Sequence, residues 1–213
     1  MIFAVGVLAG GAGFTLFKLS FNDQPAAQLA ATTPIETTAS ADKPRGPVTE
    51  LPNFSLPNRE GVTQSIRSWP NKSLIVNFWA TWCAPCRKEI PFLNQISKKE
   101  AAAGFEVVGI AIDYRDAVLP FAKEIGIDYP LLIGEEQGLA AADAFGVPSP
   151  GLPFTVFTDN KGRIVTLLMG ELTPAKADVI LGAVKDVNSG KSTPEAARIA
   201  IAGKVSKLPV SSP

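Results

Sequence analysis

The chain has 213 residues, of which 46% are hydrophobic and 19% are charged. This composition predicts a packed core and excludes wholesale disorder. Lys and Arg total 20, and so do Asp and Glu, so the net charge is zero and favours no nucleic-acid partner. The absence of histidine excludes Ser-His-Asp and Cys-His hydrolases and the Cys-x-x-Cys-His haem attachment site. A structural zinc site needs about four Cys or His ligands, and this chain has only two cysteines.

An uncharged apolar run occupies residues 1–17 and ends at Lys18. As a helix it would be about 25 Å long, which is the short end for a membrane span. We expect residues 1–19 to form a membrane anchor or signal segment. An uncleaved signal anchor is favoured over a cleaved signal peptide and a buried soluble helix. Residues 20–48 are rich in Ala, Thr and Pro, which predicts a flexible linker.

A globular domain is predicted at residues 49–188, followed by a tail at 189–213. The tail is expected to hold one short helix, opened by the Ser192-x-x-Glu195 pattern of a capping box. Hydrophobic periodicity, turn residues and helix caps define the elements of the domain. In chain order they are a hairpin at 53–66, a buried strand at 73–80, a helix from Cys83, a strand at 105–112, a helix at 116–126, a strand at 129–134, a helix at 138–147, a hairpin at 154–170 and a helix at 174–187. This order predicts a mixed β-sheet with helices on both faces.

The only two cysteines, Cys83 and Cys86, follow the strand at 73–80 and open the next helix. Unpaired backbone N–H groups at the start of a helix stabilise a thiolate, so we expect a lowered pKa for Cys83. Cys86 shares the inward face of that helix with Ile90 and Leu93 and should be more buried. Pro91 interrupts the helical pattern and is expected to kink the helix.

This asymmetry predicts that an exposed Cys83 attacks a substrate disulfide and that Cys86 then resolves the mixed disulfide. The alternative is an inert structural disulfide. Such a bridge would close a very short loop and would stabilise the fold only weakly. The strand before the pair and the helix after it favour the redox-active interpretation.

The segment NFWATWCAPCRKEIP resembles the active site of the TlpA/ResA-like thiol-disulfide oxidoreductases of the thioredoxin superfamily. The similarity continues through YPLLIG, AFGV and GLPFTVFTDNKGRIV and covers roughly residues 50–187. The residues that match the motif W-C-x-P-C-x-x-E-x-P are Trp82, Cys83, Pro85, Cys86, Glu89 and Pro91. The resemblance implies an α/β thioredoxin fold with a mixed central sheet, helices on both faces and an extra N-terminal β-hairpin.

The resemblance also implies the site residues. Cys83 and Cys86 would be catalytic, and Leu152–Pro153 would be a cis peptide facing them. Substrate would bind at Trp82, Pro85, Leu152 and Pro153, with the backbone before the proline pairing with the substrate chain. An ordinary loop proline at the start of a strand is the alternative for Pro153. Trp79 is expected in the core.

Three features depart from the thioredoxin pattern. Thioredoxins carry a buried Asp where this chain has Asn77, which cannot accept a proton; Asn at this position is typical of the TlpA-like group. Glu89 lies one turn after Cys86 and is a candidate proton acceptor for it, although a solvent-exposed helix carboxylate is the favoured interpretation. The segment GVPSPGLP has two more residues before Pro153 than the commoner V-x-G-x-P pattern, so the resemblance does not carry over the identity of the substrate.

The function predicted from these residues is a membrane-tethered periplasmic dithiol reductase without cofactor or metal. The resemblance implies protein substrates with disulfides, in cytochrome c maturation or in copper-site assembly of cytochrome oxidase. It also implies a membrane thiol-electron donor of the DsbD/CcdA type. We expect a monomer at the bacterial inner membrane with its globular domain in the periplasm, or a free periplasmic protein if the N-terminal segment is cleaved.

Two other functions are weighed against this one. A peroxiredoxin-type thiol peroxidase would need a P-x-x-x-T-x-x-C site, and Cys83 lacks that context. A metallochaperone could bind Cu(I) through two thiolates, but related copper-delivery proteins also use a histidine.

Overall fold

The computed structural model describes residues 47–209. The anchor expected at 1–19 and almost all of the linker expected at 20–48 lie outside these residues and stay predictions. Within the described part of the chain, no helix combines the length and the apolar character that crossing a membrane requires.

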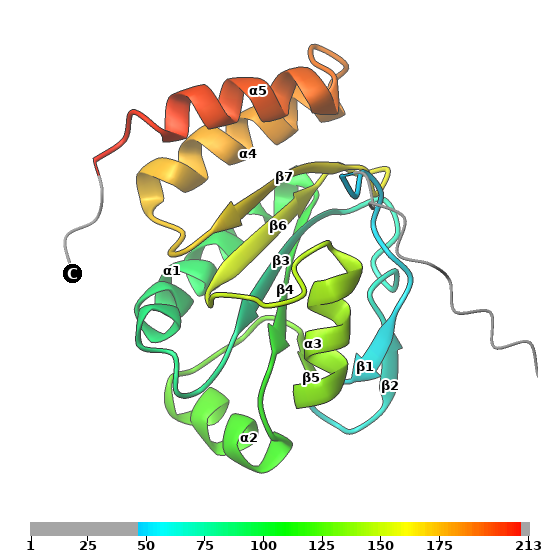
Figure 1. Ribbon diagram of the computed structural model, residues 1–213, viewed down its shortest axis with the longest axis vertical. Coiled ribbons are helices and arrows are strands. Elements are labelled where there is room, and N and C mark those ends of the chain that lie inside the picture. Colours follow the sequence, from blue (N-terminus) through cyan, green and yellow to red (C-terminus); the bar gives the residue numbers. More distant parts are fainter. Residues whose placement is uncertain (1–46, 210–213) are drawn as a thin grey trace, which may run out of the picture. The chain divides into compact units, whose positions relative to one another are not determined.

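The described residues form an α/β fold around a five-stranded mixed sheet with the strand order β5-β4-β3-β6-β7 (Figure 1). Strands β3, β4 and β5 run parallel, whereas β6 and β7 are antiparallel to their neighbours. A separate hairpin, β1–β2, precedes the sheet. The strands are β1 Ser55–Pro57, β2 Thr63–Ser65, β3 Ser73–Trp79, β4 Phe105–Ala111, β5 Leu131–Ile133, β6 Phe154–Thr158 and β7 Ile164–Met169. The helices are α1 Ala84–Glu100, the 3₁₀ turn η1 Ala101–Ala103, α2 Arg115–Glu124, α3 Glu135–Ala144, α4 Pro174–Asn188 and α5 Pro194–Val205.

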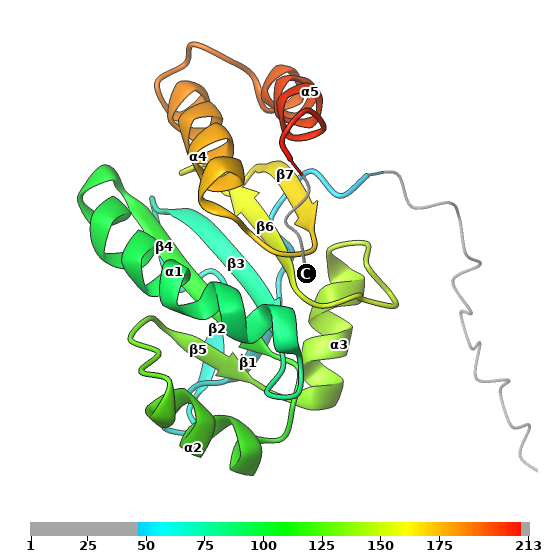
Figure 2. The same cartoon turned by 90° about the vertical axis from the view of Figure 1, so that its left-hand side faces the viewer.

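The central strand β3 is buried along its whole length. Its side chains alternate between two hydrophobic cores, as the period of two in a strand requires. Ile75 and Trp79 pack in the core with α1, α2, α4 and α5. Val76 and Phe78 pack in the core beneath the β1–β2 hairpin and α3. Figure 2 shows α1 lying along one face of the sheet, and the buried residues of α3 pack in the core on the opposite face. A strand covered on both faces explains the continuous apolar run in the sequence.

The predicted α/β fold is confirmed, and its element order matches the expected one. Several boundaries differ from the predicted ones by a few residues, and two of these differences have a clear physical reason. Helix α3 begins at Glu135, ahead of the predicted 138, because the two glutamates at its start suit the positive end of the helix dipole. The tail helix α5 is capped by Thr193 and not by Ser192; the Thr193 hydroxyl accepts a hydrogen bond from the Ala196 N–H at 3.2 Å.

Helix α5 packs on α4 and on β7, the last strand of the sheet. Arg198 reaches from α5 and donates hydrogen bonds to the carbonyls of Ile164, at 2.7 Å, and Val165, at 3.2 Å. Unpaired groups on an edge strand invite pairing with another chain, and this helix covers part of that edge.

We predict that Gly109→Ala destabilises the fold by about 1–3 kcal/mol, because a buried methyl at this position overpacks the core. Gly109 lies in β4, and a Cβ there would come within 2.6 Å of a Leu131 methyl and 3.1 Å of Trp79 Nε1. The matched control is Gly182→Ala in α4, where an added Cβ would meet nothing within 4 Å beyond the local helix backbone, so helix propensity alone should stabilise the fold by about 0.5–1 kcal/mol. Urea denaturation of both variants measures the two effects. A Gly109→Ala variant as stable as the unmodified protein would contradict this packing.

Candidate active site

The two cysteines lie at the carboxyl end of β3, where the chain turns into α1. Cys83 is the N-cap of α1, and its Sγ accepts the backbone N–H of Cys86 at 3.3 Å. Pro85 stands in the first turn, where a missing N–H costs no hydrogen bond. The sulfurs of Cys83 and Cys86 form a disulfide in this structure. The predicted strand–turn–helix setting of the pair is therefore confirmed.

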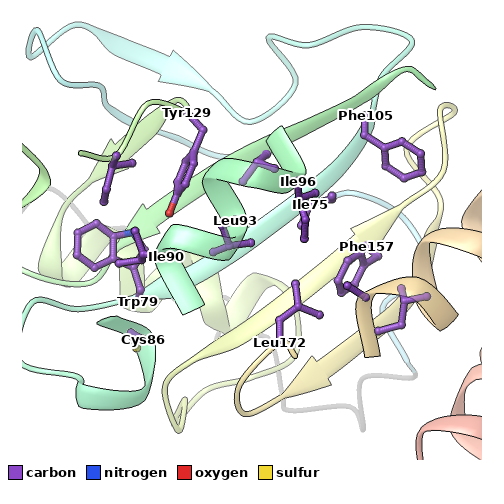
Figure 3. Packing of buried hydrophobic residues seen from close by; sticks show 14 of the residues in the cluster. Ile75, Trp79, Cys86, Ile90, Leu93, Ile96, Phe105, Tyr129, Phe157 and Leu172 are labelled. Atoms are coloured by element: carbon purple, nitrogen blue, oxygen red, sulfur yellow. The ribbon is translucent and has the colours of Figure 1, made fainter. Parts of the chain in front are cut away.

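The two sulfurs differ less in burial than the sequence suggested. Cys86 is fully buried on the inward face of α1, in line with Ile90 and Leu93, as predicted (Figure 3). Cys83 was expected to be exposed, but only 4% of it is accessible in the disulfide form. The reason is that Cys83 also packs into the hydrophobic core cluster on this face of the sheet. Exposed Ala84 and Pro85 follow Cys83 directly in the chain and form part of the surface around the disulfide.

Glu89 is buried beneath the cysteines, with 1% of its surface accessible. The interpretation of Glu89 as a solvent-exposed carboxylate is wrong. Its Oε1 accepts the Asn77 side-chain amide at 2.7 Å, and its Oε2 accepts the backbone N–H of Leu172 at 2.7 Å. One helical turn separates Cys86 from Glu89, so the two side chains are neighbours on α1. The helical spacing from Cys86 was the signal in the sequence that could have placed Glu89 inward.

Burial raises the pKa of Glu89 from 4.5 to about 7. Loss of hydration is the largest cause, and the hydrogen bonds from Leu172 and Asn77 oppose it without cancelling it. A carboxyl group with a pKa near 7 is half-ionised at neutral pH, which is the condition for efficient proton exchange. Glu89 can therefore accept or return a proton in the core.

Asn77 joins this carboxyl group to the sheet. Its Nδ2 also donates to the Thr155 hydroxyl at 3.0 Å, while its Oδ1 has no partner among the described residues. An amide carries both a donor and an acceptor, so a rotated Asn77 could accept a hydrogen bond from the protonated carboxyl group of Glu89. The ionisable group of this core thus sits on α1 and not on β3, where thioredoxins carry their Asp.

The loop before Cys83 is anchored by Asp113, which follows β4. Asp113 is 6% exposed and accepts both the backbone N–H of Thr81, at 3.1 Å, and the Thr81 hydroxyl. Trp82, the next residue, is 71% exposed, and Tyr114 beside Asp113 is 66% exposed. Two large aromatic side chains are thus held at the surface near the disulfide, while Trp79 is fully buried in the core as predicted. No sequence motif marks Asp113, because its role depends on two parallel strands ending side by side.

The peptide bond between Leu152 and Pro153 is cis, as the resemblance implied. Phe154 opposes Phe78 in the sheet register, which places Pro153 next to the end of β3 that leads to the cysteines. The Pro153 carbonyl accepts the Gly170 N–H at 2.8 Å. The backbone N–H and C=O of Leu152 have no hydrogen-bond partner within residues 47–209. Leu152 can therefore offer both groups to another extended chain.

Within the same described residues, no three Cys, Asp or Glu side chains cluster as metal ligands. A peroxidatic P-x-x-x-T-x-x-C site ending at Cys83 would place Pro at position 76 and Thr at position 80. These positions hold Val76 and Ala80, and both are buried in the core.

Comparison with known proteins assigns the fold and the family. The AhpC/TSA family matches residues 47–167, more than half of the chain. The chain belongs to this family. The thiol-disulfide oxidoreductase ResA of Bacillus thuringiensis (strain Al Hakam) is 30% identical over 168 residues, covering 78% of this chain and 84% of the relative.

Two solved structures are similar in fold. A thiol:disulfide interchange protein from Chlorobium tepidum has a TM-score of 0.53 and 27% identity, covering 76% of this chain and 99% of its own. A secreted thiol-disulfide isomerase from Corynebacterium glutamicum has a TM-score of 0.53 and 29% identity, covering 71% of this chain and 85% of its own. The chain is a ResA/TlpA-like protein of the thioredoxin superfamily, and with its Cys-x-x-Cys pair it is a thiol-disulfide oxidoreductase.

We predict that Glu89 makes the folded protein less stable as the pH rises from about 4.5 to 7. Over this interval the unfolded chain releases the proton of Glu89 while the folded chain still holds it, so the unfolded state is favoured. The stabilisation is complete below pH 4.5 and is lost as the pH passes 7, by an amount on the order of 3 kcal/mol.

Denaturant unfolding of Glu89→Gln and of the unmodified protein across this interval isolates the effect. The difference in free energy of unfolding between the two proteins should change with pH in this direction. A difference that is constant from pH 4 to pH 8 would contradict a raised pKa for Glu89.

Proposed function

We propose that this protein is a membrane-tethered periplasmic dithiol reductase of protein disulfides. The observation that carries the proposal is the Cys83–Cys86 disulfide at the N-terminus of α1, with the buried carboxyl group of Glu89 one turn behind it. A sulfur at a helix N-terminus is stabilised as an anion, and a group that takes up the partner's proton completes a dithiol exchange.

In the proposed reaction, the Cys83 thiolate attacks one sulfur of the substrate disulfide, and the other substrate sulfur leaves as a thiolate. Cys86 then loses its proton to Glu89 and attacks the Cys83 sulfur. The second substrate thiolate leaves, and the Cys83–Cys86 disulfide forms. Two electrons have then moved from the protein to the substrate, which becomes a dithiol once its thiolates take up protons.

Substrate binding is assigned to the rim of the site. The unpaired backbone groups of Leu152 can pair with an extended substrate segment, next to Pro153. Exposed Trp82 supplies an apolar contact beside the disulfide, and exposed Pro85 borders the sulfur pair. Each of these residues lies at the carboxyl edge of the sheet, where open α/β folds bind ligands.

The cellular context of the proposal comes from the apolar run at residues 1–17 and from the ResA/TlpA-like family. The protein would act as a monomer, with its domain on the periplasmic side of a bacterial inner membrane. Its substrates would be disulfide-bearing proteins in cytochrome c maturation or in copper-site assembly of cytochrome oxidase. A DsbD/CcdA-type membrane protein would return electrons to the cysteine pair.

We predict that Cys86→Ser accumulates a stable mixed disulfide between Cys83 and its substrate, because the resolving sulfur is missing. Non-reducing electrophoresis of cell extracts followed by mass spectrometry detects the adduct and identifies the partner. Cys83→Ser is the matched control and should accumulate several-fold less adduct, since Cys86 is fully buried. Equal trapping by both variants would contradict the assignment of Cys83 as the attacking residue.

The direction of electron transfer is tested by the reduction potential of the pair. A reductase should equilibrate with glutathione or thioredoxin buffers well below the value of a strong oxidant, which is about −120 mV. Tryptophan fluorescence or thiol labelling across such buffers measures it. A potential near that of a strong oxidant would overturn the reductase and leave a dithiol oxidase.

A further inference from the structure

A hollow lies at the end of the sheet opposite the cysteines. It has a volume of about 250 Å³ and is bounded by the loop before β3 and the turn between β6 and β7. We call it the amino-end cavity, because Lys72 and Leu74 place it at the amino end of β3. The lining includes Arg67, Trp69, Lys72, Asn160 and Lys161.

The charged side chains that line the amino-end cavity are all cationic. Three cationic side chains, Arg67, Lys72 and Lys161, line it, and no acidic residue within 47–209 does. The nearby acid Asp159 is fully buried in an ion pair with Arg163 at 2.6 Å and presents no free charge.

Glu106 on β4 attracts Lys72 and offsets part of its charge. The Arg67 guanidinium also donates to the Leu51 carbonyl, which leaves its charge unneutralised. Half-buried Trp69 adds an aromatic ring to this cationic rim.

The chain enters the folded domain beside this cavity. The carbonyl of Thr49 accepts the Ile164 N–H, and the Leu51 N–H donates to the Gly162 carbonyl, both at 2.7 Å. Leu51 and Gly162 themselves line the cavity. The 46 residues that precede the described part, with their uncharged run at 1–17, therefore join the domain at its cationic end.

The redox pair lies at the other end of the same strand. Strand β3 has seven residues, so the amino-end cavity and the start of α1 are separated by about 20 Å. Helix α4 also ends on the cavity side. There the Asn188 side chain donates a hydrogen bond to the Ser73 hydroxyl and accepts one from the Asn160 backbone N–H.

We propose that the amino-end cavity and its three cations bind the phosphates of anionic lipid headgroups, with Trp69 at the interface. This inference rests on the proposed membrane tether and extends it, since the tether would deliver this end of the domain to the bilayer. Basic side chains near an anionic membrane surface strengthen binding, and tryptophan favours the headgroup region. Docking in this way aims the cysteines away from the bilayer and toward soluble disulfide proteins. A membrane-embedded electron donor reaches Cys83 only after release, so the binding is weak and reversible.

The test uses the full chain reconstituted into phosphatidylcholine vesicles with and without phosphatidylglycerol, both carrying brominated acyl chains. Bromine quenches tryptophan fluorescence at short range. We expect quenching in the vesicles that contain phosphatidylglycerol, little in pure phosphatidylcholine, and loss of the difference in Trp69→Phe. Raising the salt concentration should also abolish the difference in quenching between the two lipid compositions, because salt screens exposed charges.

The matched variants are Lys72→Gln/Lys161→Gln and the control Lys204→Gln/Lys207→Gln, which neutralises two exposed lysines at the far end of α5. Each neutralised cation in the cavity should weaken docking about fivefold, so the first variant should lower the ratio of docked to free domain about 25-fold. The control should leave it unchanged.

Equal quenching in both lipid compositions, or no change in the Lys72→Gln/Lys161→Gln variant, would overturn the proposal. So would tight binding of inorganic phosphate alone in a calorimetric titration, which would mark a small-anion site instead.

Reduction of a soluble disulfide protein by the same preparations tests the proposed function separately. All four lysines lie outside the redox site, so the reductase activity should persist in both variants. If the unmodified protein lacked this activity, the proposed reductase function would be contradicted, but the lipid contact would not.

Discussion

The hydrogen bonds that hold the carboxyl group of Glu89 tie together the three parts of the chain that enclose the cysteines. Asn77 comes from the central strand, Glu89 from the redox helix α1, and Leu172 from the segment between β7 and α4. A buried carboxyl group is tolerated only when such partners offset its lost hydration. Here the two bonds do so incompletely, and the remaining cost of burial appears as a pKa near 7. The same interaction thus orders the core and leaves a proton acceptor behind Cys86.

The sheet supplies the second condition for the chemistry. Because β3 and β4 are parallel, their carboxyl ends meet at one edge, and the loops after them carry Cys83 and Asp113. Asp113 holds the loop that leads to Cys83, and the cis peptide at Pro153 lies at the end of the antiparallel neighbour β6. One edge of a mixed sheet therefore collects the sulfur pair, its aromatic rim and the unpaired backbone of Leu152.

The two ends of β3 have different surroundings. The carboxyl end carries the disulfide with exposed aromatic groups, and the amino end carries three cations next to the point where the chain enters the domain. A strand is rigid when it is buried on both faces, so an orientation imposed at one end is transmitted to the other. In this view, contact with lipid at the amino end sets the direction in which Cys83 faces.

The sequence by itself determined the parts of this protein that depend on local order. Hydrophobic periodicity, Pro174 after the Thr173 cap and the short spacing of Cys83 and Cys86 predicted the order of strands and helices and the place of the redox pair. The sequence did not predict the contacts between distant segments, because these depend on which faces meet after folding. Glu89 becomes a buried base only when Leu172, 83 residues further on, closes over it. The limited accessibility of Cys83, the anchoring by Asp113 and the gathering of Arg67, Lys72 and Lys161 around one hollow are likewise decided by tertiary packing.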